Sequence, residues 1–236
     1  MATTCVRGWD SALCGRTTVS GILVTGPHRS GSSITAAMLE ALGVDFNRPP
    51  AGWPVYDSNP EGQHGEDQEF IRLFNEAMGN WRLPILYTWK KDACDKLRAL
   101  IATRECKLLW GIKAPRMCFI GGWMLQYMDK PKLVICARDL EATAQSLHAR
   151  EPVLMPLLAA RYLAGMYWLG AVTLVAHAQR RDIPICFVDY AETCDDPQGI
   201  ATRLCRFVHG KAFPDRIDAA AALVNPSLNH HRATIK

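Results

Sequence analysis

The sequence lacks the long apolar segments that would place the protein in or across a membrane. Its first twenty residues contain no apolar stretch of the kind that forms the core of a signal peptide. The most lipid-like segment, Tyr162–Ala178, is shorter than the roughly 20 apolar residues that a spanning helix needs, and arginines stand on both sides of it. We therefore interpret it as a buried core helix rather than a membrane span, and expect a cytoplasmic protein that binds no membrane.

The sequence also lacks the cysteine patterns of zinc sites and of disulfide scaffolds. It has nine cysteines, none of them in a Cys-x-x-Cys pair, and several lie within apolar runs. An odd number at irregular spacing favours reduced, mostly buried thiols. Because no Cys/His cluster has the spacing of metal ligands, we expect no metal site.

A strong charge of either sign is missing as well. The net charge of +4 suits an anionic ligand but is too small to indicate nucleic-acid binding. With 49% apolar and 21% charged residues, the chain has the composition of an ordinary globular protein. Its 236 residues are enough for one well-cored domain, so we expect a single domain over residues 1–236, with 1–20 as an N-terminal extension.

Short apolar runs alternate with helical patterns along the chain, and none of the runs shows strict alternation of apolar and polar residues. Such runs are typical of strands that are covered on both faces. The expected strands are Gly21–Thr25, Leu108–Ile112, Lys132–Ala137 and Ile183–Val188. The expected helices are Ser33–Leu42, Glu66–Met78, Gly122–Met128, Leu140–Arg150, Pro156–Arg180 and Pro197–Val208. This order predicts parallel crossovers and a three-layer α/β/α domain.

The segment Gly21–Leu42, "GILVTGPHRSGSSITAAMLEAL", has the layout of a strand, a glycine-bounded turn and a helix. Glycines let the backbone approach a ligand closely, and the N–H groups at a helix start bind anions. The turn adds the hydroxyls of Ser30, Ser32 and Ser33 and the guanidinium of Arg29. It lacks the lysine that ends the phosphate loop of a nucleoside triphosphatase. The turn is therefore P-loop-like, although an ordinary strand–turn–helix corner is the alternative.

A second polar group lies in "KLVICARDLEATAQSL", Lys132–Leu147. The expected strand ends at Arg138, Asp139 is a favoured helix N-cap residue, and Ser146 follows two turns later. In open α/β sheets, ligands bind at the carboxyl ends of the strands, where Arg138 would lie. The alternative is that Asp139 only caps the helix and Arg138 is its surface partner.

Taken together, the two segments resemble the paired signatures of the sulfotransferases that use 3′-phosphoadenosine 5′-phosphosulfate (PAPS). "GPHRSGSS" is similar to the loop that binds the 5′-phosphosulfate, and "VICARDLEATAQSL" to the segment whose Arg and Ser bind the 3′-phosphate. The resemblance implies a sulfonate transfer that leaves PAP and needs no metal. The cofactor-binding residues that it implies are Pro27, His28, Arg29, Ser30, Gly31, Ser32, Ser33, Arg138, Ser146, Tyr190 and Arg232.

Three further stretches extend the resemblance to about Arg232. "WGIKAPRM", Trp110–Met117, is similar to a Lys-x-Pro-Arg segment of bacterial members; "FVDYAETCDDPQGIATRLCRFVHG" and "NPSLNHHR" are similar to the C-terminal region. This chain departs from the common cytosolic branch of the family, which has Lys at the position of Arg29. In having Arg there, it is similar to the tyrosylprotein and bacterial branches.

Four residues are candidates for the chemistry. Arg29 and Lys113 would stabilise the charge that develops during transfer. Glu66 is the preferred general base and His64 its rival, because the imidazole pKa is naturally suited to neutral pH. Lys113 could equally be an ordinary strand-end lysine, and Glu66 a first-turn glutamate that the helix dipole favours.

The loop 44–65 holds Pro49, Pro50, Pro54 and Pro60, and follows the helix of the P-loop-like turn. A loop of this length covers a substrate or is a solvated connection; as a substrate loop it would select a small-molecule or carbohydrate acceptor. Two other functions stay open. One is a P-loop nucleotide or small-molecule kinase, which would need ATP and Mg²⁺, and the other is a nucleotide-binding protein without catalysis. The sequence leaves the oligomeric state open.

Overall fold

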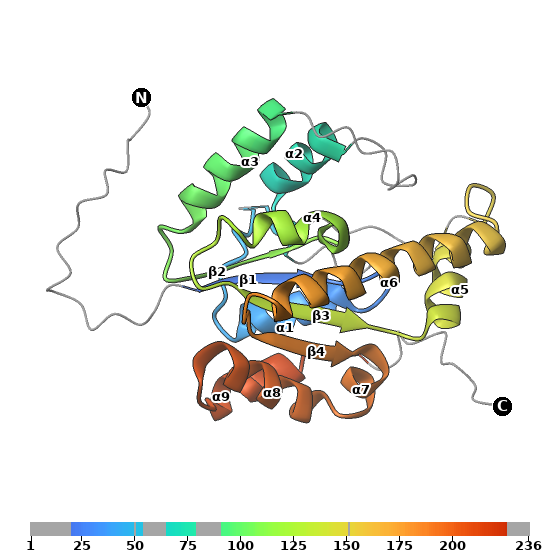
Figure 1. Cartoon of the computed structure of the whole chain (residues 1–236). Coiled ribbons are helices and arrows are strands. Elements are labelled where there is room, and N and C mark those ends of the chain that lie inside the picture. The colour runs from blue at the N-terminus through green and yellow to red at the C-terminus, as the bar shows by residue number, and fades with distance from the viewer. Residues whose placement is uncertain (1–19, 50, 54–64, 79–90, 151, 226–236) are drawn as a thin grey trace, which may run out of the picture.

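The computed structural model describes residues 20–49, 51–53, 65–78, 91–150 and 152–225. Its centre is a sheet of four parallel strands, β1 (Ser20–Thr25), β2 (Leu109–Lys113), β3 (Lys132–Ala137) and β4 (Ile185–Asp189), in the order β2-β1-β3-β4. All four carboxyl ends therefore lie at one edge of the sheet, beside α5 (Figure 1). The four strands match the expected ones to within two residues at each end.

Strands β1, β2 and β3 bury both of their faces, which explains their continuous apolar runs, whereas β4 exposes Phe187. In β1, Ile22 and Val24 face one core and Leu23 faces the other; in β3, Cys136 and Ile135 divide in the same way. All five of these side chains are buried. The sheet is thus the middle layer of the molecule.

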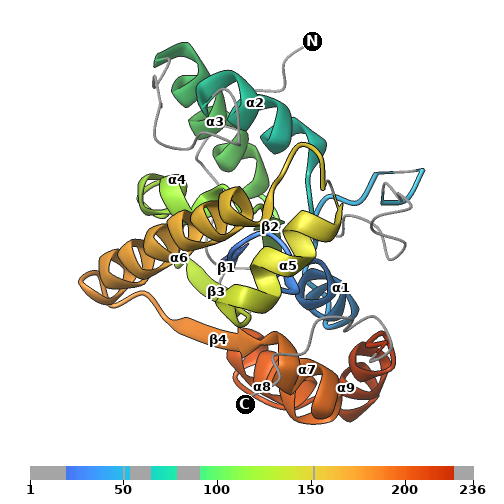
Figure 2. The same cartoon turned by 90° about the vertical axis from the view of Figure 1, so that its right-hand side faces the viewer.

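Helices cover the two faces of the sheet as separate layers. The helices are α1 (Ser32–Ala41), α2 (Gln68–Met78), α3 (Lys91–Arg104), α4 (Met117–Met124), α5 (Leu140–Arg150), α6 (Leu157–Gln179), α7 (Tyr190–Asp195), α8 (Pro197–His209) and α9 (Pro214–Ala221). Figure 2 shows α1, α8 and α9 on one side of the sheet and α2, α3, α4 and α6 on the other. Buried residues of these two groups of helices contribute to two separate cores. The expected three-layer α/β/α fold with a parallel sheet is confirmed.

Three helices were absent from the sequence prediction, and one was misplaced. The missed helices are α3, α7 and α9. Helix α4 begins at Met117 rather than at Gly122. A Cβ at Gly121 would lie 2.9 Å from Leu174 of α6 and 3.0 Å from Leu23 of β1. Gly121 therefore allows α4 to pack closely between the sheet and α6.

The first part of the predicted substrate loop packs against β2, the strand at one side of the sheet. The N–H group of Asp45 donates to the carbonyl of Leu109, and that of Gly111 donates to the carbonyl of Asp45. Phe46 is buried, and so is Trp53, whose Nε1 donates to Glu40 at 2.9 Å. Phe46 and Trp53 are therefore part of the core rather than of a solvated connection. Residues 54–64 lie outside the described residues, and so does nearly all of the N-terminal extension 1–20.

Helix α6 is long and apolar enough to cross a membrane by length and composition alone, and 39% of its most apolar window is buried. One face, which includes Leu163, Tyr167 and Leu174, packs into the core as expected for a core helix. The other face exposes apolar side chains: Leu158, Tyr162, Leu169 and Val172. The interpretation as a buried core helix is thus correct for one face only.

Candidate functional site

The P-loop-like turn joins the carboxyl end of β1 to the start of α1, as expected. Gly31 has a φ of 85° at the N-cap position of α1, and no side chain caps the helix there. Arg29 has a φ of 66°, which is uncommon for a residue with a side chain. A Cβ at Gly26 would lie 2.2 Å from the carbonyl oxygen of Cys136, so only glycine fits against β3. Gly31 has no side chain that could cap α1, and backbone N–H groups at such a helix start are suited to bind an anion.

The serines of the turn provide hydroxyls in different surroundings. Ser30 is 1% exposed, and its Oγ has no hydrogen-bond partner among the described residues. A buried polar atom without a partner is unfavourable unless a ligand or water completes it. Ser32 is also buried, and Ser33 accepts a hydrogen bond from Lys113 Nζ at 3.2 Å. The unpaired hydroxyl fits a site that an anionic group completes.

Arg138 and Ser146 converge on this turn, although they are more than a hundred residues away from it. Arg138 follows β3 directly and donates from a guanidinium nitrogen to the carbonyl oxygen of Arg29 at 3.1 Å. The Nε of Arg29 donates to Ser146 Oγ on α5 at 3.0 Å. Burial lowers the pKa of the Arg138 guanidinium from its ordinary value. Two guanidinium groups and a hydroxyl thus lie together at the carboxyl edge of the sheet.

Tyr190 closes the same site from the fourth strand. It is the first residue of α7, which Asp189 caps by accepting a hydrogen bond from the N–H group of Glu192. The Arg138 guanidinium lies over the Tyr190 ring, with Cζ 4.7 Å from the centroid. A Cβ at Gly31 would lie 2.4 Å from the same ring. The aromatic ring therefore lies between the turn and Arg138.

A buried ion pair lies next to the serines, at the end of β2. Lys113 is 1% exposed, and its Nζ lies 2.5 Å from Glu66 Oε1. The Glu66 side chain is 17% exposed. Gly65, at a φ of 74°, accepts a backbone hydrogen bond from Lys113 and leaves no room for a Cβ beside Ala36. This backbone contact brings Glu66 to the site, where it is the more accessible member of the pair.

His28 lies in the turn among cations and keeps its imidazole neutral. Burial, reinforced by the cations Arg116, Arg150, Lys113 and Arg29, lowers the pKa of His28 to about 3. Its Nε2 forms a hydrogen bond of 3.2 Å with the hydroxyl of Tyr167 on α6. The surroundings of the turn are therefore strongly electropositive, which suits a ligand with several negative charges.

The structure brings most of the predicted residues together. The candidate residues of the turn lie close to Lys113, Glu66, Arg138, Ser146 and Tyr190. Within the turn, the carbonyl oxygen of Pro27 accepts a hydrogen bond from Ser30 N. The rival base His64 and the tail residue Arg232 lie outside the described residues. Sequence reasoning missed Tyr167. It lies in an apolar helix and has no local signal, and only the packing of α6 brings it to the turn.

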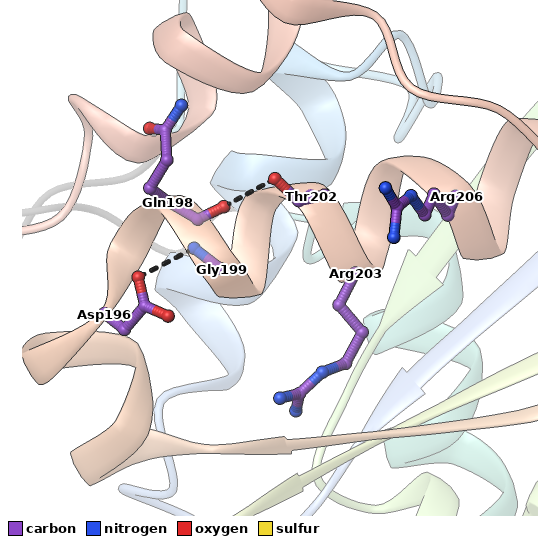
Figure 3. A pocket seen from close by; sticks show the side chains of 6 residues that line it. All are labelled: Asp196, Gln198, Gly199, Thr202, Arg203 and Arg206. Atoms are coloured by element: carbon purple, nitrogen blue, oxygen red, sulfur yellow. Dashed lines mark hydrogen bonds between the residues drawn. The ribbon is translucent and has the colours of Figure 1, made fainter.

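A surface depression on α8 is separate from this site. Asp196, Gln198, Gly199, Thr202, Arg203 and Arg206 line it. Several of its polar groups already have partners: Asp196 accepts from Gly199 N and Thr202 donates to the carbonyl of Gln198 (Figure 3), while Gln198 donates to Asp218 and Arg203 pairs with Glu192. None of the predicted site residues lines it.

Three solved structures that share this fold are sulfotransferases or sulfotransferase domains. The sulfotransferase domain of the Synechococcus PCC 7002 olefin synthase is 15% identical, with a TM-score of 0.52 over 96% of this chain and 85% of that one. The sulfotransferase domain from the curacin biosynthetic pathway is 13% identical, with a TM-score of 0.50 over 92% of this chain and 87% of that one. Sulfotransferase STF9 from Mycobacterium avium is 12% identical, with a TM-score of 0.53 over 87% of this chain and 67% of that one.

No protein-family model matches the chain, and no curated protein matches its sequence. The structural likeness therefore shows the sulfotransferase fold, as the sequence motifs predicted.

Proposed function

We propose that this chain, which has the sulfotransferase fold, transfers a sulfonate group from PAPS to a hydroxyl or amine acceptor. The observation that carries the proposal is that Arg138 and Ser146 both contact Arg29 in the P-loop-like turn, which we call the anion-binding turn from here on. A nucleotide with phosphate groups on both the 3′ and 5′ positions has two separate anionic groups, and this site offers two sets of donors for them.

The residues present fit such a nucleotide. The N–H groups at the start of α1 and the unpaired hydroxyl of Ser30 would hold the 5′-phosphosulfate. Arg138 and Ser146 would hold the 3′-phosphate, with Arg232 as a further contact from the tail. Tyr190, which already packs against Arg138, would contact the adenine. PAPS supplies the sulfonate and leaves as PAP, and in this proposal no metal takes part.

The chain's own residues would provide the acid–base chemistry and the charge stabilisation. Glu66 would accept the proton of the acceptor hydroxyl, because its carboxylate is partly exposed at the site. Lys113 and Arg29 would stabilise the negative charge that develops on the leaving phosphate. Lys113 Nζ contacts both Glu66 and Ser33, so one buried cation joins the base to the anion-binding turn. His64 remains the rival base.

Product analysis with ³⁵S-labelled PAPS tests the reaction. The whole chain would be incubated with a panel of hydroxyl and amine acceptors that includes small molecules and carbohydrates. Transfer of the label to at least one acceptor, abolished by Glu66→Gln, is the expected result. Tight PAP binding without any labelled product would instead support a nucleotide-binding protein without catalysis. Mg²⁺-dependent transfer of phosphate from ATP would support the kinase.

We further propose that the acceptor is a small molecule or a carbohydrate, and that the protein is cytoplasmic and binds neither nucleic acid nor membrane. Residues 54–64 of the substrate loop would help to choose the acceptor.

A further inference from the structure

The anion-binding turn holds a conformation that its own sequence does not favour. Arg29 has a positive φ of 66° and is flanked by residues that are not glycine, His28 and Ser30. Such a residue keeps this conformation only where the surrounding structure holds it. The contacts that hold Arg29 in this conformation therefore preorganise the site.

On one side, the contacts come from β3 and α5. Arg138 binds the carbonyl oxygen of Arg29, and Ser146 accepts from its side chain. Both partners belong to the candidate 3′-phosphate site.

On the other side, the contact comes from α6 through His28. The hydroxyl of Tyr167 lies 3.2 Å from His28 Nε2, and the two rings meet edge to face with centroids 4.8 Å apart. Tyr167 is 1% exposed, and its ring also meets Phe119 edge to face at 4.8 Å. His28 is thus fixed by both a hydrogen bond and ring packing.

The hydroxyl of Tyr167 is the feature that packing alone does not explain. Its buried neighbours in the same cluster, such as Leu147, Leu163 and Ala171, are apolar. A phenylalanine would fill the same space without placing a polar atom there. Because His28 is neutral, its ring has one N–H group and one acceptor nitrogen, and either can pair with a hydroxyl. The hydroxyl therefore has a specific partner in the turn.

We propose that Tyr167 is a positioning residue which, through His28, holds the anion-binding turn in the conformation that receives the 5′-phosphosulfate. The proposal rests on the proposed function, because it assigns the effect of Tyr167 to the 5′ end of a nucleotide. Tyr167 touches neither nucleotide nor acceptor in this account, and acts only through His28.

The test compares three adenosine nucleotides on the full chain: PAP, adenosine 5′-monophosphate (5′-AMP) and adenosine 3′-monophosphate (3′-AMP). Affinities would be measured by calorimetry, with displacement titrations for weak ligands. Tyr167→Phe keeps the ring and removes the hydroxyl. Tyr162→Phe on the exposed face of α6 makes the same chemical change away from the turn and is the matched control.

We expect Tyr167→Phe to raise the dissociation constants of PAP and 5′-AMP by the same factor, about three- to tenfold, as for the loss of one hydrogen bond. The affinity for 3′-AMP, which carries no 5′ group, should stay unchanged, and Tyr162→Phe should change none of the three. In a His28→Ala background, Tyr167→Phe should have no additional effect, because its partner is already absent.

The outcomes separate this inference from the proposed function. An unmutated protein that binds PAP no more tightly than 5′-AMP would count against the proposed function itself. If it does prefer PAP, three results would overturn the inference alone. These are equal weakening of all three nucleotides, no difference between Tyr167→Phe and Tyr162→Phe, or a full additional loss in the His28→Ala background.

Discussion

At the scale of single residues, the site depends on a few charged side chains that the fold brings to the carboxyl edge of the sheet. Arg29 is central, because it combines a left-handed backbone with a hydrogen bond from its side chain to Ser146. The place of Arg29 in the site could be predicted from the turn motif, and that of Ser146 from its own segment. Their direct contact could not, because it depends on how closely α5 packs beside the turn.

Arg29→Ala should lower the rate of sulfonate transfer by about a hundredfold, as for the loss of about 3 kcal/mol of charge stabilisation in comparable oxyanion sites. Arg29→Lys should retain part of the activity, because the charge remains while the bidentate geometry is lost. Steady-state kinetics with labelled PAPS measures both. Arg161→Ala, which removes an exposed arginine paired with Glu141, is the control and should stay near normal. Near-normal turnover in a folded Arg29→Ala variant would remove Arg29 from the mechanism.

Glu66→Gln should nearly abolish turnover while PAP still binds. The substitution keeps the size of the side chain and its contact with Lys113 but removes the proton acceptor, so kcat should fall selectively. Single-turnover kinetics and calorimetry on the same variant separate the two effects. If His64→Ala loses turnover and Glu66→Gln stays active, the base is His64 instead.

At the scale of elements, apolar runs were the better guide to strands than charge-rich patterns were to helices. β1 and β3 were predictable because both of their faces are buried, which leaves an uninterrupted apolar run. Helix α3 was missed although Ala93, Leu97 and Leu100 have helical spacing, because charged residues separate them. The short helices α7 and α9, of six and eight residues, depend on caps and packing more than on periodicity.

The turn between β1 and α1 should tolerate no side chain at Gly31. Gly31→Ala would have to accept both a φ of 85° and a Cβ 2.4 Å from Tyr190. Gly210 has a φ of 72°, and a methyl group added there would meet no atom within 4 Å, so this position isolates the backbone contribution. Gly210→Ala should lower the free energy of unfolding by about 1 kcal/mol. Gly31→Ala should lower it further and weaken PAP binding, as denaturant unfolding and calorimetry would show. Equal losses in the two variants would mean that Tyr190 does not constrain the turn.

At the scale of the whole molecule, a neutral histidine inside an electropositive site links stability to pH. The unfolded chain binds a proton at His28 near pH 6.5, whereas in the folded protein the pKa is lowered to about 3. Between these values the unfolded state holds more protons, so the stability from this group is complete above pH 6.5 and falls as the pH is lowered.

The slope from His28 should approach 1.4 kcal/mol per pH unit within that window, on the order of the value for one proton. Denaturant unfolding of the unmutated chain and of His28→Gln at several pH values between 4 and 7 measures it. The variant should show a smaller slope by up to this amount. Identical slopes would show that His28 is not held neutral by the fold.

The central claim is that the site recognises a nucleotide with phosphates at both the 3′ and 5′ positions, and calorimetry on the full chain tests it most directly. PAP should bind at least tenfold more tightly than 5′-AMP or ATP, because Arg138 and Ser146 add charge-assisted contacts to the 3′-phosphate. Arg138→Ala should remove most of this preference and leave 5′-AMP binding nearly unchanged. Equal affinity of the unmutated protein for PAP and 5′-AMP would contradict the account, and tight Mg²⁺-dependent binding of ATP would favour the kinase.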